Sequence, residues 1–326
     1  MRRHLCALAS AFAVAAGSFV LPGSAAACSV CQAGDPIYSA GGAGAQEKGT
    51  LSAYLELSGW YKTSGLLPHE AGEEPEPGSE QNRGEQIGLF LGWTPIDRLT
   101  ATLLLPWRFN KITERHEGEE PENFRLNGFG DLSLHLGYVL WRDRDVLPSS
   151  WVELRGFFKA PSGKSHQTVD GELDPHLQVG TGSWDFGFGL AGAHRLAWAS
   201  LYLSAFYREN LEGSLDYKYG DVMLTNAAVE VPLSHFCENP VVAALTPGLE
   251  LNFRYAEKDR FQGEDYDDSG GSVLYAAPTL KVRLPWFEGK RPPFVRAGVQ
   301  IPVTSNWLYG KQNEDAVWSA GIGYAY

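Results

Sequence analysis

The sequence is poor in methionine, cysteine and positive charge, and each shortage narrows the range of functions. Only two methionines occur in 326 residues, which argues against a methionine-rich surface for metals or peptides. Asp and Glu outnumber Lys and Arg by 39 to 27, so the formal net charge is −12. Because nucleic-acid binding relies on a basic face that neutralises phosphates, we expect no nucleic-acid partner.

Long apolar runs are also missing beyond the N-terminus. After residue 27 no uninterrupted stretch reaches the length of about 18 residues that a membrane-spanning helix needs. Yet 44% of the residues are hydrophobic and 12% are aromatic, while the mean hydropathy is only −0.23. The chain must therefore shelter many aromatic side chains without using apolar helices.

The N-terminus indicates export. Two arginines precede an apolar run at 5–21, and small residues follow at 24–27. This pattern is typical of a secretory signal peptide. We predict a cleaved signal peptide over 1–27, a periplasmic N-terminal segment over 28–49 and a β-barrel over 50–326.

From residue 50 onward apolar and polar residues alternate with a period of two. In 132–140 one parity is apolar while the other carries Asp131, Ser133 and His135, and 316–326 behaves alike. A period of two fits strands that separate two unlike environments. Twelve segments show it: 50–62, 85–94, 98–112, 130–141, 151–161, 182–194, 198–208, 219–232, 246–257, 271–284, 293–303 and 315–326.

An even strand number and alternating connection lengths indicate a bacterial outer-membrane barrel. Brief turns alternate with long polar connections, which are 63–84, 113–129, 162–181, 209–218, 258–270 and 304–314. We therefore predict an all-β fold, a transmembrane antiparallel β-barrel with both ends periplasmic, in contact with outer-membrane lipid. Interfacial girdle residues would be Trp93, Trp107, Trp141, Trp151 and Trp318.

A soluble secreted β-sandwich or propeller would also show alternation. Neither architecture requires an even strand number or alternating connection lengths, so the barrel is favoured. The final Tyr326 follows apolar residues at every second position. This ending is typical of the strand by which the barrel-assembly machinery recognises its substrates, and that machinery is an expected partner.

Specific strings then support a family resemblance. They are Trp93-Thr94-Pro95-Ile96-Asp97-Arg98-Leu99, Leu103-Leu104-Leu105-Pro106, Gly128-Phe129-Gly130-Asp131-Leu132, Lys159-Ala160-Pro161-Ser162-Gly163-Lys164 and Gly180-Thr181-Gly182-Ser183-Trp184-Asp185. From about residue 50 to 326 the chain resembles the outer-membrane transporter-like family associated with the phenol-degradation meta pathway. The resemblance implies a barrel with an uptake role and no catalytic residues. The opening Cys28-Ser29-Val30-Cys31 is similar to a subset with an N-terminal cysteine pair.

If the apolar parity faces lipid, the other parity lines the lumen. Its ionisable residues are Lys62, Arg108, Arg155, Lys159, Arg208, Arg254, Lys281, Arg283, Arg296, Glu56, Asp131, Glu153, Asp185, Glu230 and Glu250. Cations outnumber anions, and charged rings select ions in pores. We predict a passive or selective transporter of small solutes with a weak anion preference. The alternative is a structural or redox-linked barrel whose lumen charges pair with one another and plug the interior.

The cysteines share one side of the membrane in this topology. Cys28, Cys31, His235 and Cys237 would all be periplasmic, where a disulfide is the expected state. A thiophilic metal site is the alternative, because two thiolates and a histidine can complete a tetrahedron. We expect no other cofactor.

Catalysis is not expected. Asp131, Ser133 and His135 superficially offer an acid, a hydroxyl and a base on one strand face. Same-face neighbours along a strand lie about 7 Å apart, too far for a catalytic triad. The sequence therefore predicts a protein that is not an enzyme.

Overall fold

A computed structural model describes residues 47–65, 80–115, 120–145, 148–168, 175–265, 269–284, 292–306 and 315–326. The predicted signal peptide over 1–27 and nearly all of the segment 28–49, with Cys28 and Cys31, lie outside these described residues. No helix in the described ranges is long and apolar enough to cross a membrane.

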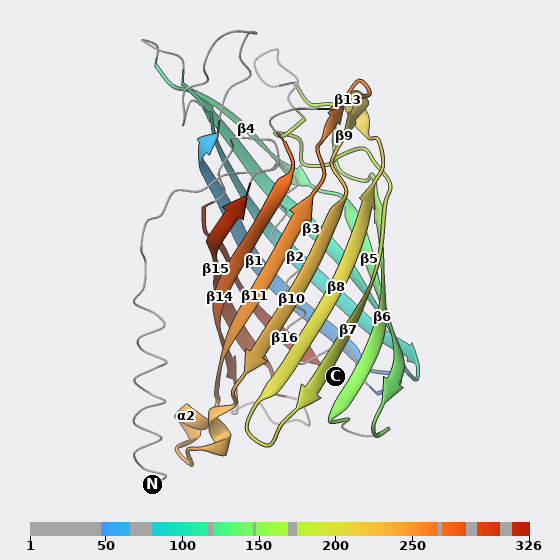
Figure 1. The fold of residues 1–326 in the computed structure, drawn as a ribbon, viewed down its shortest axis with the longest axis vertical. Helices are drawn as coiled ribbons and strands as arrows, with labels where there is room; N and C mark the ends of the chain where they lie inside the picture. Colours follow the sequence, from blue (N-terminus) through green and yellow to red (C-terminus); the bar gives the residue numbers. More distant parts are fainter. Residues whose placement is uncertain are drawn as a thin grey trace.

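Antiparallel strands make up most of the described chain and stand as one tilted, closed barrel (Figure 1). The barrel strands are β1 Leu51–Gly65, β2 Glu80–Ile96, β3 Leu99–Glu114, β4 Glu122–Phe129, β5 Leu132–Arg142, β6 Ser150–Ala160, β7 Asp185–Arg195, β8 Ser200–Asn210, β10 Val222–Glu230, β11 Leu245–Ala256, β14 Gly271–Arg283, β15 Phe294–Asn306 and β16 Val317–Ala325. Because β4 and β5 both pair with β3 as two pieces of one interrupted strand, the barrel has 12 strands, as predicted.

The first and last strands close the barrel. β1 pairs with β16 in continuous register from Ser52↔Ala325 to Trp60↔Val317. Tyr326 extends this pairing, since its backbone N–H donates to Leu51 O and its own carbonyl accepts from Leu51 N–H. Closure removes the unpaired strand edges that lipid would otherwise leave without hydrogen-bond partners.

The outer face is apolar, as the alternation predicts. The most exposed large apolar side chains on the strands include Leu203 on β8 and Phe188 on β7, which are 63% and 66% exposed. On the same strands the other parity is turned inward, and from Asp185 to Ala193 and from Ser200 to Asn210 it is buried or half-buried. A surface of this kind is stable only when lipid covers it, so the protein resides in the bacterial outer membrane.

The predicted tryptophan girdle is confirmed in part. Trp93, Trp107 and Trp141 are exposed on the outer face. Trp151 is instead buried and packs against Val139 and Ala191. The prediction was wrong for Trp151 because this residue shares the inward parity of Glu153 on β6.

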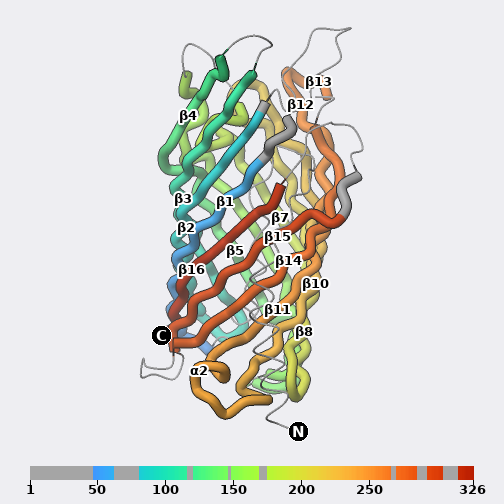
Figure 2. The backbone as a smooth tube through the Cα atoms, turned by 90° about the vertical axis from the view of Figure 1, so that its left-hand side faces the viewer, coloured from blue at the N-terminus to red at the C-terminus, as the bar shows by residue number. Residues whose placement is uncertain are grey.

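Connection lengths alternate between the two ends of the barrel. At one end β2 and β3 are joined through Asp97 and Arg98 alone, and β7 and β8 by a similarly tight turn. At the other end, the extracellular one by the usual asymmetry, the longer connections carry the short strands of a second sheet, visible in Figures 1 and 2. These strands are β9 Tyr217–Lys218, β12 Arg260–Phe261 and β13 Glu264–Asp265.

Two connections contain more regular structure than the sequence predicts. The expected loop over 113–129 is wrong for most of its length, because β4 continues the pairing with β3 beyond the expected strand ends. Between β10 and β11 lie the 3-10 helix η2 Leu233–His235 and the short helix α2 Pro240–Ala243. Asn239 caps α2 by accepting hydrogen bonds from Val241 N–H and Val242 N–H.

Adjacent strand positions face lipid and lumen in turn, so we expect a charged substitution to be tolerated at one position and not at the next. We expect Leu203→Lys to destabilise the folded barrel by about 2–4 kcal/mol, because the ammonium group would face the bilayer midplane. Ser204→Lys, one residue on, points into the lumen and should cost much less. Unfolding in lipid vesicles measures both, and an equal loss in the two variants would contradict the assigned faces.

Candidate functional site in the barrel lumen

The lumen is lined by charged and polar side chains that the barrel wall shields from solvent and lipid. Most of the charged residues predicted to face inward are buried. The buried ones are Glu56, Arg108, Asp131, Glu153, Lys159, Asp185, Glu230, Glu250, Arg254 and Arg296. Arg155, Arg208 and Lys281 are half-buried, and the side chain of Lys62 lies outside the described residues. Arg283 is exposed and donates to Ala243 O in the periplasmic connection.

Lys159 lies between two carboxylates in the extracellular half of the lumen. Its Nζ is 2.5 Å from Asp185 Oδ2 and 3.5 Å from Asp131 Oδ2, and all three side chains are almost inaccessible. A buried charge is stable only when it is paired and hydrogen-bonded. One cation shared by two anions leaves a formal negative charge that other donors must compensate.

Backbone and hydroxyl groups of the β6–β7 connection supply those donors. Asp131 accepts hydrogen bonds from Gly163 N–H at 2.9 Å, from Thr181 N–H at 2.8 Å and from Thr181 Oγ1 at 2.9 Å. Asp185 accepts from Ser183 Oγ at 2.8 Å. The three charged residues therefore hold both ends of this connection against the inner wall.

Three glycines allow the β6–β7 connection to pack closely against the barrel wall. A Cβ atom on Gly180 would lie 2.6 Å from the carbonyl carbon of Gly163, and one on Gly163 would lie 2.9 Å from that of Gly130. Side chains cannot be accommodated at such distances. The backbones of Gly130, Gly163 and Gly180 therefore pack directly on one another.

Ser162 fills the break between β4 and β5. Its Oγ accepts from Leu132 N–H at 2.8 Å and donates to Gly130 O at 3.3 Å. The interruption of this barrel strand is therefore part of the site, since it supplies the backbone groups on which the β6–β7 connection docks.

The later part of the connection is enclosed inside the barrel. Leu177 and Val179 are buried, and Val179 has no exposed surface. Asn110 on β3 donates to Leu177 O at 3.1 Å and to Gln178 O at 2.9 Å. The connection thus reaches from β6 and β7 to β3 within the lumen and narrows it.

Two further extracellular connections, between β8 and β10 and between β11 and β14, hold the β6–β7 connection in place from the extracellular side. Tyr217 of β9 donates to the fully buried Asp259 at 2.6 Å and shares a hydrogen bond of 2.9 Å with His176 Nε2. Tyr219 Oη donates to Pro175 O at 3.0 Å, and Asp259 also accepts from Gly220 N–H at 2.7 Å. The three connections form one hydrogen-bonded cap over part of the lumen.

The periplasmic half of the lumen is organised differently, by single ion pairs that form either within one strand or across one intervening strand. Lys281 Nζ lies 2.8 Å from Glu230 Oε2, and Arg155 Nε lies 3.0 Å from Glu153 Oε1. Arg296 pairs with Glu250. Each of these cations has its own carboxylate, so this half carries little unpaired positive charge.

Arginines near the Lys159 cluster have no such partners. Within the described residues, neither Arg108 nor Arg208 forms an ion pair. Arg108 Nε donates to Gln86 Oε1 at 3.3 Å, and the Arg208 guanidinium lies 6.0 Å from the centre of the Phe157 ring. Their positive charges are therefore available to the extracellular half of the lumen.

The periplasmic residues that the sequence grouped are described only in part. Cys237 is buried and belongs to a disulfide, whereas Cys28 and Cys31 lie outside the described residues. His235 is exposed and its ring packs edge-on against Phe236. In the part of the chain that the structure describes, no three His, Cys, Asp or Glu side chains are grouped closely enough to hold a metal.

Ser133 and His135 on β5 are in hydrogen-bond contact, whereas Asp131 does not contact the histidine. Ser133 Oγ lies 3.2 Å from His135 Nε2, so the spacing argument against contact was wrong for this pair. The two side chains lean toward each other along the strand. Asp131 instead binds Thr181 and Lys159, and it therefore does not orient the histidine.

Sequence reasoning missed that distant motifs meet. The strings that begin at Gly128, Lys159 and Gly180 read as separate turns and strand ends, yet they contribute Asp131, Lys159, Ser162, Thr181 and Asp185 to one cluster. A signal was present, since all three strings contain glycine and a charged residue, and the cations of one string are opposite in sign to Asp131 and Asp185 of the other two. Nothing local to a string indicates which other string it contacts.

No family model and no curated protein matches the chain. Among solved structures, it is similar to the COG4313 outer membrane channel from Pseudomonas putida F1, with a TM-score of 0.63 and 13% identity over 88% of this chain and 98% of that chain. The translocator domain of the autotransporter NalP from Neisseria meningitidis gives a TM-score of 0.44 and 12% identity over 86% and 89%. OccK1 (OpdK) from Pseudomonas aeruginosa gives a TM-score of 0.35 and 6% identity over 85% of this chain and 98% of that chain. At 13% identity, the first likeness establishes the fold that the two chains share, an outer-membrane β-barrel.

Proposed function

We propose that the protein is an outer-membrane channel that admits small solutes through a lumen narrowed on its extracellular side. The observation that carries the proposal is the combination of a lipid-facing apolar exterior with a polar lumen in which Lys159, Asp131 and Asp185 hold the β6–β7 connection. Narrow lumens lined by charges and amides select solutes by size and by hydrogen bonding.

The sequence resemblance supports uptake as the role. Strings such as Trp93-Thr94-Pro95-Ile96-Asp97 resemble a transporter-like family associated with the phenol-degradation meta pathway, and Cys28 and Cys31 resemble its cysteine-bearing subset. Within this proposal the protein is not an enzyme, and the barrel-assembly machinery inserts it in the membrane. The competing function, a plugged structural or redox barrel, would require the lumen to pass nothing.

The channel is proposed to favour anions weakly. In the extracellular half, Arg108 and Arg208 add positive charge that no ion pair within the described residues neutralises. In the periplasmic half the cations are paired with carboxylates. Unpaired guanidinium groups near a constriction attract anions and repel cations.

A reversal-potential measurement tests this preference. In a planar bilayer under a KCl gradient, the wild-type protein should give the sign expected for chloride. Arg108→Gln and Arg208→Gln should each move the potential toward the cation side, while Arg98→Gln in the periplasmic turn serves as the matched control. A wild-type potential that favours potassium would reject the anion preference.

The close glycine packing predicts a separate effect on channel width. Gly180→Ala places a methyl group 2.6 Å from the backbone of Gly163, so the connection must shift away from the wall. We expect a stability cost of about 1–3 kcal/mol and an altered single-channel conductance. Gly156→Ala is the control, because its Cβ atom would lie 3.7 Å from Leu136. Conductance that stays at the wild-type value in Gly180→Ala would show that the connection does not limit the channel.

The cysteines are proposed to be structural, without a resident metal. Cys237 belongs to a disulfide, and a sulfur in a disulfide is not available as a thiolate ligand. We expect maleimide to label Cys237 in unfolded protein only after reduction, and elemental analysis to find no stoichiometric zinc or copper. A free Cys237 thiol together with one bound metal per chain would support the metal-linked alternative.

A further inference from the structure

A row of uncharged polar side chains separates the two charged parts of the lumen. Ser204 on β8, Asn226 on β10 and Asn252 on β11 are direct cross-strand neighbours. Asn226 Nδ2 donates to Ser204 Oγ at 3.1 Å, and Asn252 Nδ2 donates to Gln300 Oε1 of β15 at 3.2 Å. Glu250 lies at the next inward position toward the periplasm, and Arg254 at the next toward the outside.

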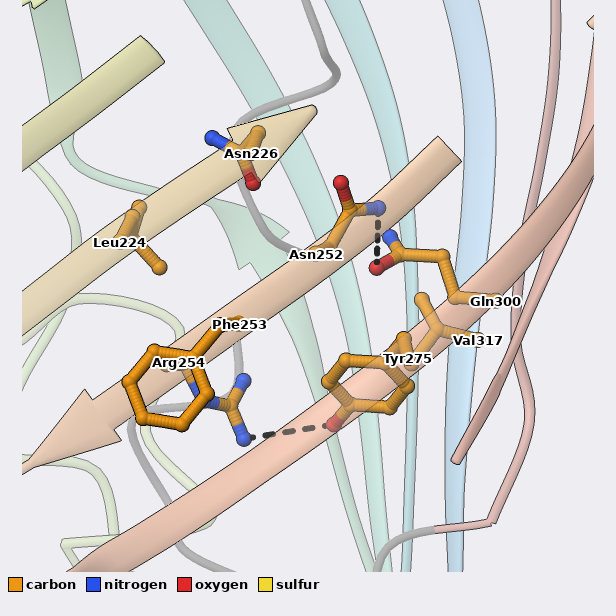
Figure 3. Close-up of a pocket in the computed structure, with 8 residues that line it drawn as sticks. All are labelled: Leu224, Asn226, Asn252, Phe253, Arg254, Tyr275, Gln300 and Val317. Carbon is orange, nitrogen blue, oxygen red and sulfur yellow. Dashed lines mark hydrogen bonds between the residues drawn. The ribbon is translucent and has the colours of Figure 1, made fainter. Parts of the chain in front are cut away.

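A recess opens in the barrel wall at this row. Asn226, Asn252, Arg254, Tyr275 and Gln300 supply its polar lining, while apolar residues of β10, β11 and β16 complete it (Figure 3). The cavity measures about 20 Å³. This volume accepts one water or one hydroxyl-sized group, and it is too small for a ring.

The recess offers both kinds of hydrogen-bonding partner. Asn252 Oδ1 is buried without a partner, so an acceptor is open there. Gln300 uses only its Oε1 in the contact with Asn252, so among the described residues its N–H groups have no acceptor. Turning both amides over would exchange these roles and would still leave one acceptor and one donor.

Arg254 limits the charge that the recess accepts. Its guanidinium donates to Tyr275 Oη at 3.5 Å and lies 5.9 Å from the centre of that ring, on the extracellular side of the amides. A cationic group would be repelled by this guanidinium. A carboxylate would be attracted by the same guanidinium, but in a space that accepts one hydroxyl-sized group its oxygens would meet the open carbonyl of Asn252, where two acceptors face each other.

We infer that the recess of Asn226, Asn252, Arg254, Tyr275 and Gln300 is a solute-binding subsite for a hydroxyl group of an uncharged, hydroxylated solute such as a short polyol. A hydroxyl donates one hydrogen bond and accepts another, which matches the open Asn252 oxygen and the open Gln300 N–H. The inference rests on the proposed channel function and adds the chemical class of its solute. The remainder of such a solute lies in the lumen beside the recess.

Saturation-transfer NMR on the whole protein in a detergent without sugar headgroups tests this subsite. The probes are erythritol, butyrate and butylammonium, which share a four-carbon chain and differ in charge and hydroxyl content. Wild-type protein should transfer saturation to erythritol more strongly than to either ion. Gln300→Met and Asn252→Leu should lose most of the erythritol signal, whereas Gln86→Met, a lumen glutamine outside the recess, should keep it.

Folding and transport are scored separately from binding. Heat-modifiable electrophoretic mobility shows whether each variant folds. If Asn252→Leu does not fold, the result for Gln300→Met decides the test. Erythritol transfer unchanged in Gln300→Met, or equal transfer to erythritol and butyrate in the wild type, would overturn the subsite. Loss of conductance with erythritol binding intact would overturn the channel function and leave the subsite standing.

Discussion

Backbone hydrogen bonding in a solvent without water is the constraint on which this structure depends. Lipid offers no partners to N–H and C=O groups, so a strand can cross only if both of its edges are paired. Pairing of β1 with β16 satisfies that condition around the whole barrel. Once the barrel closes, each strand has one face toward lipid and one toward the lumen, and the period-two pattern of the sequence follows.

Barrel closure buries charged side chains in the lumen, and each of these charges must be paired or hydrogen-bonded to be stable. In the periplasmic half the solution is a one-to-one pairing, as in Lys281 with Glu230. In the extracellular half Lys159 is shared between Asp131 and Asp185, and backbone N–H groups of the β6–β7 connection supply the missing donors. The same interactions that make these charges stable also hold a segment inside the barrel, so electrostatics and channel width are coupled.

Much of the fold could be predicted from the sequence because alternation is a local property. Leucines such as Leu203 and charges such as Glu153 fall on the expected faces, and the strand number and connection asymmetry hold. Trp151 was misassigned because its place near a strand end suggested an interfacial residue, although it shares the inward parity of Glu153. The interruption between β4 and β5 was not predicted, since it depends on Ser162, about thirty residues away in sequence.

The candidate site was less accessible to sequence reasoning than the fold. Parity identified its charged residues one by one. Two of its contacts depend on the register between strands that are distant in sequence. They are the ion pair of Lys159 with Asp185 and the hydrogen bond of Asn252 with Gln300. Register of this kind is set by the whole barrel, so it emerges only from the three-dimensional structure.

Liposome swelling tests the central claim, an open path for small solutes, most directly. With wild-type protein in the vesicle membrane, swelling rates in uncharged solutes should exceed those of protein-free vesicles and should fall steeply as solute size increases. Swelling no faster than in protein-free vesicles, even for the smallest solute, would contradict the channel and identify the barrel as a closed structure.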